Sequence, residues 1–553
     1  MAPSPAPRNR LITVLVIAAA ACLVTLSTHG QVIDYGFNYD DYHQVRPYTI
    51  EEVVRTFSGP WDPLGIEVPF YRPLTIAFYA LRFELLGIDA RLHHALSLDL
   101  FALAAAMVGV LLLRVGAHPW LAVLGTLVFA VHPSMPYPLA VWATSQMHLL
   151  QTLLVLAGLL WWTVCRDRSV VWWLPFLLLQ VVVFLIKEDG LMLLPCIGAV
   201  HACYRWLVDR ATPPLPRLVV WMAAALMVTL LVVRHLALGG PGGYGIPGWH
   251  RALAHWSYGL IGVFLQTPIK RPWQMLASPF MLIAIQAGVV TAAVLPRLTT
   301  ERFVVALGLC LALVFNMPFV MMSKPLQWHL IATGHAMVLA AALGAVIRAL
   351  PARWPRIMGG AVVGAGILAM ALVARHTASD FAPRSAMTLY QDEIVLGWSA
   401  VPYEIREFLA RKPVDPAAAM DAVDIVAFGA YDWETGADGR RFRWTSAHTT
   451  LMVDGRARTV NVPVRATRES ALRDAGVLVR LEGGGRLLGS LRVQHDRWTE
   501  VRVRVPPRRW WSLGSRHRID LRVEPSFVPA NENPLSDDRR TLGVSMGEIS
   551  LER

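Results

Sequence analysis

Residues 170–186 read VVWWLPFLLLQVVVFLI, and the polar run Lys187-Glu188-Asp189-Gly190 follows them directly. A helix rises about 1.5 Å per residue, so an unbroken apolar segment of this length is close to what is needed to cross the hydrocarbon core of a bilayer. The next apolar segment begins at once, at 189–207. The stretch therefore predicts two membrane helices joined by a short cluster of charged side chains.

The same apolar character recurs along the first two-thirds of the chain. With 553 residues, 55% of them hydrophobic, and a mean hydropathy of +0.45, the chain is too apolar for an ordinary soluble protein and long enough for two units. Including the two segments above, we expect about eleven transmembrane helices. The other nine predicted spans are 11–27, 92–113, 118–132, 145–165, 217–237, 275–296, 302–322, 328–349 and 356–375.

Three shorter features qualify this count. Ser27-Thr28-His29-Gly30 is a poor cleavage site for a signal peptide, so the first segment is expected to stay as an uncleaved helix. Residues 74–87 and 251–267 are apolar but short, which favours helices that lie in the membrane interface.

The distribution of basic residues predicts the orientation, because Lys and Arg are retained in short cytoplasmic loops. With the N-terminus inside, every cytoplasmic connection is basic, and the odd number of spans places the C-terminal part outside. We therefore expect a bacterial inner-membrane protein with a periplasmic C-terminal domain. The basic residues of the cytoplasmic connections are Arg114, Arg166, Arg168, Arg205, Arg210, Arg217, Arg297, Arg302, Arg348, Arg353 and Arg356.

The net charge of +12 is accounted for by this topology and by contact with anionic lipid, so nucleic acid is not an expected partner. All five cysteines lie in apolar stretches, and a disulfide framework is not expected in the C-terminal third.

The composition changes after Arg375. We predict three regions: a transmembrane domain over 1–375, a linker with partial helix over 376–422, and an all-β domain over 423–553. In the last of these, period-two runs such as Glu500-Val501-Arg502-Val503-Arg504-Val505 alternate with Asp-Gly and Gly-Gly-Gly turns. This pattern is typical of an antiparallel β-sandwich, here of about eight or nine short strands.

Ionisable residues near the membrane segments gather on the predicted outer side. Such residues cost about 2.5–3.5 kcal/mol to insert, so they are candidates for function, and one wet, charged cavity would satisfy them all. The set comprises Asp40, Asp41, Arg72, His93, His94, His132, His148, Lys187, Glu188, Asp189, Arg234, His235, Lys324 and His329.

Each candidate also has a structural interpretation. The run Lys187-Glu188-Asp189 forms either a self-neutralising helix joint or part of a site. Arg72 is suited either to bidentate phosphate binding or to contact with lipid headgroups. His93 lies at the start of a predicted helix, where a structural position at the level of the lipid headgroups is the alternative to a site role. The proline after His132 is sufficient to explain why the helix ends there. Metal-ligand spacings, a P-loop and a dinucleotide-binding glycine fingerprint are not found in the sequence.

The order of these motifs resembles the GT-C superfamily of integral-membrane glycosyltransferases, and most of all its protein O-mannosyltransferase and tetratricopeptide-repeat O-mannosyltransferase branch. The similarity covers roughly residues 10–375. The C-terminal domain resembles β-sandwich domains appended to bacterial membrane glycosyltransferases, on the stretches 429–434, 443–445 and 538–544. The motifs in the membrane part are Asp40-Asp41, Tyr71-Arg72-Pro73-Leu74, Val131-His132-Pro133 and Ile186-Lys187-Glu188-Asp189-Gly190.

The resemblance implies transfer of a sugar from a polyprenyl-phosphate carrier to a periplasmic glycan, lipid or protein acceptor, with inversion. It assigns Asp40 or Asp41 as the general base, with the other orienting the acceptor or, as a less favoured option, a divalent metal; a cofactor is not otherwise implied. The residues implied near donor and acceptor are Arg72, His93, His132, Lys187, Glu188, Arg234, His235 and Lys324.

The chain departs from that branch in two ways. Tetratricopeptide repeats are not found in the sequence, and Leu326-Gln327-Trp328-His329 stands where the branch has a basic stretch. Lys324, Arg234 and His235 are the candidate replacements for the missing phosphate ligand. Two rival functions remain: a transporter or flippase of lipid-linked sugars, and a non-catalytic envelope assembly protein.

Overall fold

The computed structural model describes residues 7–37, 40–62, 70–132, 143–242, 299–318, 329–349, 357, 359–375, 403–404, 423–466, 476–507, 511–532 and 536–553. By its internal contacts the chain divides into two compact units. The first, here called the helical unit, comprises Met1–Ile33, Thr49–Phe78 and His94–Ala382. The second, the sheet unit, comprises Asp34–Tyr48, Tyr79–His93 and Pro383–Arg553. The boundaries predicted at 375 and 422 stay predictions.

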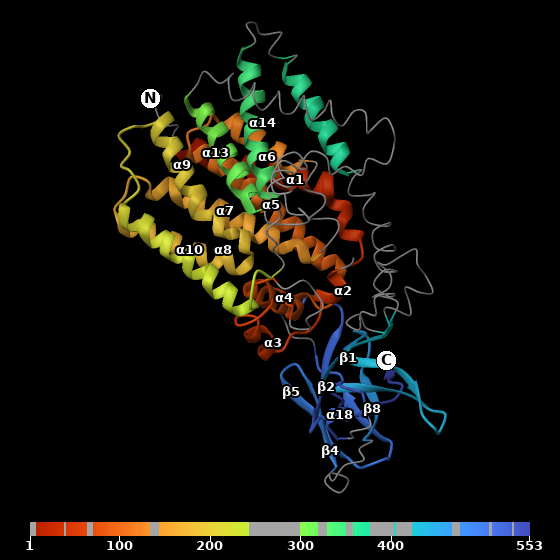
Figure 1. The fold of residues 1–553 in the computed structure, drawn as a ribbon. Coiled ribbons are helices and arrows are strands. Elements are labelled where there is room, and N and C mark those ends of the chain that lie inside the picture. Colours follow the sequence, from red (N-terminus) through yellow and green to blue (C-terminus); the bar gives the residue numbers. More distant parts are fainter. Residues whose placement is uncertain are drawn as a thin grey trace, which may run out of the picture. The chain divides into compact units, whose positions relative to one another are not determined.

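Most of the labelled helices belong to the helical unit and lie close together, with α13 beside α14 (Figure 1). The α-helices are α1 (Pro7–His29), α3 (Ile50–Arg55), α5 (Ala90–Arg114), α6 (Pro119–Ala130), α7 (Gln146–Cys165), α8 (Leu174–Ile186), α9 (Leu193–Leu207), α10 (Arg217–Leu238), α13 (Thr299–Asn316) and α14 (His329–Ala349). The short 3-10 helices are η1 (Gly30–Asp34), η3 (Ala143–Ser145), η4 (Val170–Trp173) and η5 (Glu188–Met192).

Among the described residues, seven helices are long and apolar enough to cross a membrane. Three shorter apolar helices, Pro119–Ala130, Val170–Ile186 and Gly359–Arg375, match further predicted spans. These helices coincide with all the predicted segments except 275–296, which lies outside the described residues, as does 251–267. The predicted count of eleven spans is therefore not confirmed. Residues 74–87 form α4 (Pro73–Leu86), which is not among the candidate spans.

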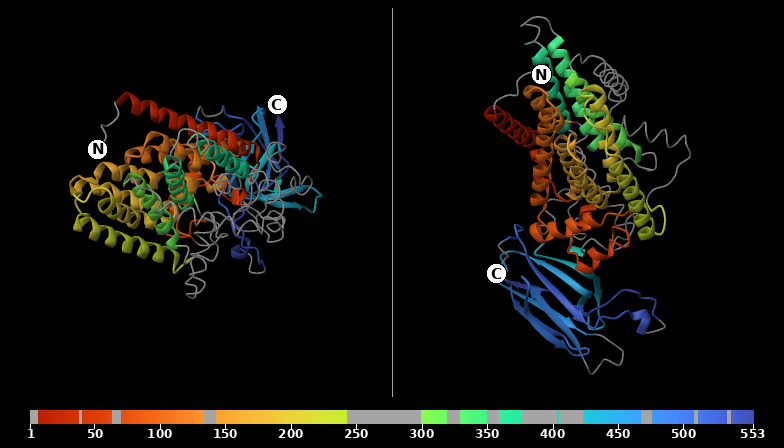
Figure 2. Two further views of the ribbon diagram at one scale, coloured as in Figure 1. Left: turned by 90° about the horizontal axis from the view of Figure 1, so that it is seen from above. Right: turned by 90° about the vertical axis from the view of Figure 1, so that its left-hand side faces the viewer.

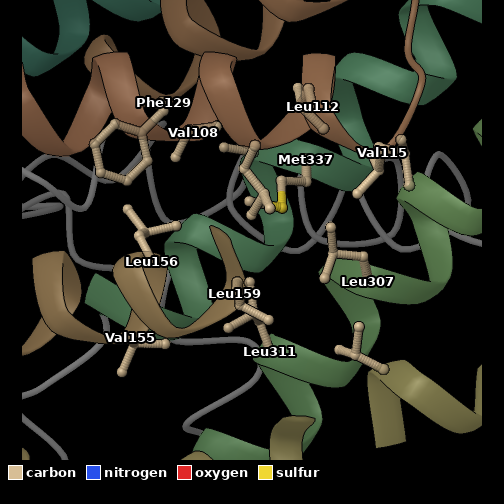
Figure 3. Close-up of a cluster of buried hydrophobic side chains, with 14 of the residues drawn as sticks. Val108, Leu112, Val115, Phe129, Val155, Leu156, Leu159, Leu307, Leu311 and Met337 are labelled. Atoms are coloured by element: carbon tan, nitrogen blue, oxygen red, sulfur yellow. The ribbon is translucent and has the colours of Figure 1, made fainter. Parts of the chain in front are cut away.

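A shared apolar core holds the helical unit together. Side chains from α5, α6, α7, α13 and α14 meet there, and Figure 3 shows Leu112, Leu156, Leu311 and Met337 among them. All four side chains are fully buried. Burying a leucine or methionine side chain contributes about 1.5–3 kcal/mol in water, and in a membrane close packing takes over that role.

In the described part of the sheet unit there are nine strands together with α2 (Asp40–Gln44), the end of α4, and α18 (Pro529–Glu532). The strands are β1 (Ile425–Thr435), β2 (Arg441–Val453), β3 (Thr459–Arg465), β4 (Val477–Gly483), β5 (Arg486–Val493), β6 (Thr499–Arg504), β7 (His517–Glu524), β8 (Ser545–Met546) and β9 (Ser550–Glu552). The alternation predicted over 500–505 is confirmed, because Val501 and Val503 are buried while Arg502 and Arg504 are exposed.

The pairing of the strands differs from the predicted sandwich of separate sheets. All nine strands are hydrogen-bonded into a single sheet in the order β5-β4-β7-β2-β8-β3-β6, with β1 paired to β2 and β9 to β3. The long strand β2 explains this, because it pairs with β7 over 448–453 and with β8 over 443–444. The right-hand view of Figure 2 shows the curvature of this sheet. Its inward-facing side chains form one apolar core. The strand count and the antiparallel pairing agree with the prediction.

Candidate functional site

The polar run after α8 forms a break between two helices of the helical unit. Lys187 is extended (φ −159°, ψ 134°), and the 3-10 turn η5 follows before α9 begins. Glu188 and Asp189 are both 6% exposed and Lys187 is fully buried. Three charged side chains in succession are thus withdrawn from solvent, which requires that they be paired.

The conformation of this break depends on Gly190. A Cβ atom at this position would lie 2.6 Å from the carbonyl oxygen of Val183 and 2.6 Å from its Cγ1. The Gln180 side chain satisfies the backbone groups that the helix ends leave without partners: its Nε2 donates to the Gly190 carbonyl (2.9 Å), and its Oε1 accepts from the Leu194 N–H (3.0 Å). The break is therefore a fixed feature of the fold.

Glu188 pairs with two arginines from distant parts of the sequence. Its Oε2 accepts from Arg72 Nε at 3.2 Å, and its Oε1 accepts from Arg234 Nε at 3.3 Å. Arg72 is 2% exposed and Arg234 8%. Two guanidinium groups on one buried carboxylate leave this triad with a net charge of +1, which is an arrangement that favours a further anion.

The triad joins two of the motifs that the sequence singled out. The Tyr71 backbone N–H donates to Glu188 Oε1 (2.8 Å), and the Thr75 hydroxyl donates to the Ile186 carbonyl (2.6 Å). The start of α4 is thus attached to the end of α8 on both sides of Arg72. The motif at residues 71–74 and the motif at residues 186–190 are therefore in direct contact, although they are far apart in the sequence.

Aromatic rings fix the guanidinium of Arg72. Its Cζ atom lies 4.0 Å from the ring centroid of Phe70 and 5.0 Å from that of Trp61. Stacking of this kind favours arginine over lysine, because the planar guanidinium presents a flat, weakly hydrated face. An arginine held by one carboxylate and two rings is preorganised for recognition of a charged group.

Arg234 reaches the triad from a helix that is otherwise exposed. The buried residues of α10 are Val219, Leu230 and Arg234, whereas large apolar side chains such as Leu231 and Leu236 are exposed. Exposed aliphatic side chains on an apolar helix are expected to face lipid. Arg234 is therefore the charged side chain that α10 buries within the helical unit.

A second network starts from the neighbouring charges of the same break. Lys187 Nζ lies 2.5 Å from Asp189 Oδ2, and Gln151 Nε2 donates to Asp189 Oδ1 at 2.5 Å. Gln151 Oε1 contacts His329 Nε2 at 3.1 Å. The network therefore runs from the break through α7 to the first residue of α14.

His148 completes this second network. It lies on the same face of α7 as Gln151, three residues away, and its ring centroid is 4.8 Å from that of His329. Both histidines are at most 5% exposed. Lys187 and Asp189 balance each other in charge, so this part fits the helix-joint interpretation of the motif, whereas Glu188 belongs to the positively charged triad.

The described part of the chain places the other predicted site residues as follows. Asp41 and His93 belong to the sheet unit, His132 is buried at the end of α6, and His235 is exposed although its neighbour Arg234 is not. The structure describes Asp40 as the first residue of α2 but not its side chain, and Lys324 lies outside the described residues. The predicted roles of these residues stay predictions.

The contributors that were not predicted as site residues include Gln151, Gln180, Phe70, Trp61 and the backbone N–H of Tyr71. Glutamine and tryptophan inside or beside apolar segments carry no pattern of their own, so the sequence offered no signal for them. Asp189 was expected to belong either to a helix joint or to a site, whereas His148 and His329 were expected on the outer side without an assigned role. Among the described residues, no group of three or more His, Cys, Asp or Glu side chains is arranged to hold a metal ion.

The chain is similar to solved structures of membrane proteins at low sequence identity. No protein-family model matches the chain, and no curated protein matches it in sequence. The crystal structure of the Archaeoglobus fulgidus oligosaccharyltransferase tethered with an acceptor peptide is similar to it with 13% identity and a TM-score of 0.39, over 66% of this chain and 55% of that one. The arabinosyltransferase EmbB from Mycobacterium smegmatis is similar with 11% identity and a TM-score of 0.28, over 96% and 64%.

The chain thus spans less than two-thirds of the length of either structure. Both scores are too low for the likeness to carry an argument about what this chain does.

Proposed function

We propose that this chain is a membrane glycosyltransferase of the GT-C type, which transfers a sugar from a polyprenyl-phosphate carrier to a periplasmic acceptor. The observation that carries the proposal is the pair of buried arginines, Arg72 and Arg234, on the single carboxylate of Glu188. The positive charge and the fork geometry of these two arginines suit a phosphate group. The resemblance of the motif order adds the reaction class.

In the proposed reaction Arg72 and Arg234 bind the phosphate of the donor. Charge develops on the bridging oxygen as the bond between that oxygen and the anomeric carbon breaks, and positioned cations stabilise this charge. The bond pair leaves with the polyprenyl phosphate. Phe70 and Trp61 hold the Arg72 guanidinium in place throughout, so little reorganisation is needed.

The acceptor hydroxyl supplies the nucleophile. The resemblance assigns Asp40 or Asp41 to remove its proton as the new bond to the anomeric carbon forms. A single displacement of this kind inverts the anomeric centre. The acceptor would be a glycan, a lipid or a protein. We further propose that the enzyme lies in a bacterial inner membrane, with its N-terminus in the cytoplasm and the sheet unit in the periplasm.

The test uses the purified full-length chain in lipid nanodiscs with tritium-labelled short-chain polyprenyl-phosphate mannose, glucose, galactose and arabinose in turn. Release of labelled sugar to water or to added glycan acceptors is measured. We expect Arg72→Lys and Arg234→Lys to lower kcat/KM at least about tenfold, because lysine retains the charge but not the fork.

Arg166→Lys is the matched control. Arg166 also has a carboxylate neighbour, Asp167, at 3.3 Å and aromatic contacts with Trp162 and Tyr204. It follows the C-terminal end of α7, whereas His148 and Gln151 of the second network lie near the N-terminal end of that helix. Its substitution should leave transfer unchanged. If none of the four donors is consumed, the proposal is wrong; if a donor binds and crosses the bilayer without loss of its sugar, the chain is a transporter.

A further inference from the structure

The last turn of α4 and the residues after it are held by the C-terminal part of the chain within the sheet unit. The Leu513 backbone N–H donates to the Leu85 carbonyl at 2.8 Å. Gly514 follows, and a Cβ atom there would lie 2.6 Å from the Leu86 carbonyl oxygen. This close approach is compatible only with glycine. The backbone at 513–514 therefore lies directly against the end of α4.

Two side-chain contacts extend this attachment. Phe83 is 3% exposed and meets the ring of Phe428 from β1 edge to face, with centroids 5.9 Å apart. Glu84 forms an ion pair with Arg518 of β7. Arg518 also pairs with Asp520 at 2.9 Å, so its position is fixed from within the sheet. We refer to these contacts of residues 83–86 with the sheet as the α4 clamp.

The residue before this segment, Arg82, is coupled to the loop that carries the acid pair. Arg82 is 1% exposed, stacks on Tyr79 at 4.5 Å and lies near enough to Asp41 for electrostatic attraction. Asp41 is itself fully buried. A carboxylate without solvent contact depends on a cation held in place beside it. Arg82 therefore adds a positive charge to the surroundings of Asp41.

A second contact links this segment to the same loop. His93 Nε2 donates to the Gly87 carbonyl at 2.9 Å, which fixes its imidazole. The ring of His93 then packs edge to face against Phe37, with centroids 5.3 Å apart. Phe37 precedes α2 in the chain. The turn after α4 thus supports the acid loop at Phe37 as well as at Asp41.

We propose that the C-terminal sheet is a positioning domain for the acid loop: by clamping residues 83–86 it fixes Arg82 and His93, and through them Asp41 and α2. Glu84 and Arg518 are positioning residues in this scheme. The catalytic meaning of the coupling rests on the proposed function, whereas the physical coupling does not. A sheet that served only as a binding module for the acceptor would need no contact with α4.

The coupling is tested by hydrogen–deuterium exchange on the full-length chain in nanodiscs. Glu84→Ala removes the ion pair, and Gly514→Val forces residues 513–514 away from the Leu86 carbonyl. We expect amides of residues 37–48 to exchange at least about fivefold faster in both variants, including the Val45 N–H that donates to the Asp41 carbonyl at 2.7 Å. Arg502→Ala, which breaks the Arg502–Glu552 pair in the same sheet, should leave these amides unchanged.

The Leu513 amide reports on the clamp itself. Faster exchange at Leu513 with unchanged exchange over 37–48 overturns the proposal, and so does unchanged exchange at both places, because the clamp would then hold nothing. The double variant Glu84→Arg with Arg518→Glu should restore slow exchange over 37–48 to within about twofold. A merely destabilised sheet would not be rescued by reversal of one charge pair.

A kinetic measurement separates this inference from the proposed function. With a polyprenyl-phosphate sugar that the unmodified chain consumes, Glu84→Ala should lower kcat at least about fivefold and leave KM for the donor unchanged, since the donor is assigned to Arg72 and Arg234. Unchanged kcat with faster exchange over 37–48 would refute the catalytic role of the coupling. If the unmodified chain consumes no donor, the proposed function fails while the exchange result still decides the coupling.

Discussion

Arg72 and Glu188 are 116 positions apart in the chain, and their side chains form a buried ion pair with 3.2 Å between Nε and Oε2. Arg234 adds a second cation to the same carboxylate. A buried pair of this kind contributes little net stability compared with an apolar core, but loss of one partner is costly because a charge is left without compensation. The relationship therefore makes Glu188 the most sensitive position of the site.

Glu188→Ala is expected to lower the free energy of unfolding by about 3–5 kcal/mol, since it removes the carboxylate that two buried guanidinium groups share. Glu188→Gln should cost less, because the amide oxygen can still accept from the Tyr71 N–H. Thermal unfolding in detergent measures both changes. Asp167→Ala is the control, as its pair with Arg166 is more exposed and should be worth less than about 1 kcal/mol.

The sequence singled out motifs whose residues are in contact in the structure, but it did not show how they pair. Tyr71-Arg72-Pro73 and Lys187-Glu188-Asp189-Gly190 were singled out because charged residues beside apolar segments are rare. Spacing along the chain contains no information on which charge meets which, and the motif that looked self-neutralising divides in two. Lys187 pairs with Asp189, while Glu188 turns to Arg72 and Arg234. Tertiary packing decides this division.

Gly190→Ala tests whether the helix break depends on glycine. The new methyl group would meet the Val183 carbonyl at 2.6 Å, a backbone atom that cannot move without disturbing α8, so we expect a loss of more than about 2 kcal/mol. Gly198→Ala in α9 is the matched control. Its nearest atom would be Leu215 Cδ1 at 3.8 Å, and alanine favours helix by about 1 kcal/mol, so that variant should be slightly more stable. Equal effects of the two substitutions would contradict the prediction.

Gln151→Leu removes the residue that joins Asp189 to His329. Both partners are buried and each would lose a hydrogen bond, which predicts a loss of about 1–3 kcal/mol for each group left unsatisfied. Gln31→Leu serves as the control, because Gln31 donates to the Arg375 carbonyl at an exposed site and should cost less than about 0.5 kcal/mol. Chemical unfolding in mixed micelles compares the two. A smaller effect at Gln151 than at Gln31 would show that the network is not structural.

In the sheet unit the individual strands were predicted from the sequence, but their arrangement in one sheet was not. Alternation of valine with arginine gave the strands and their buried faces, since side chains on a strand point to opposite sides. It could not give the single curled sheet, because that depends on β2 pairing with β7 along one part of its length and with β8 along another. Pairing between strands distant in sequence leaves no local pattern.

Acid should weaken the sheet unit through Asp520. Burial by itself would raise the pKa of this carboxyl group, but hydrogen bonds from His448 and Thr450 and the charge of Arg518 lower it to about 2, from an ordinary value of 3.8. The folded state therefore binds the proton more weakly than the unfolded state does. The resulting stabilisation of about 2 kcal/mol is complete above pH of about 4 and is lost as the pH falls toward 2.

The measurement is hydrogen exchange of the amides in β2 and β7 between about pH 2 and 5, corrected for the intrinsic pH dependence of exchange. The unmodified chain should lose protection in these strands across that range. Asp520→Asn should show lower protection at pH 5 and a flatter pH profile, because an amide does not titrate in this range and its oxygen accepts from His448 and Arg518 without a negative charge. Asp432→Asn, at an exposed position of β1, should keep the original profile. A profile for Asp520→Asn as steep as that of the unmodified chain would assign the acid sensitivity to other carboxyl groups.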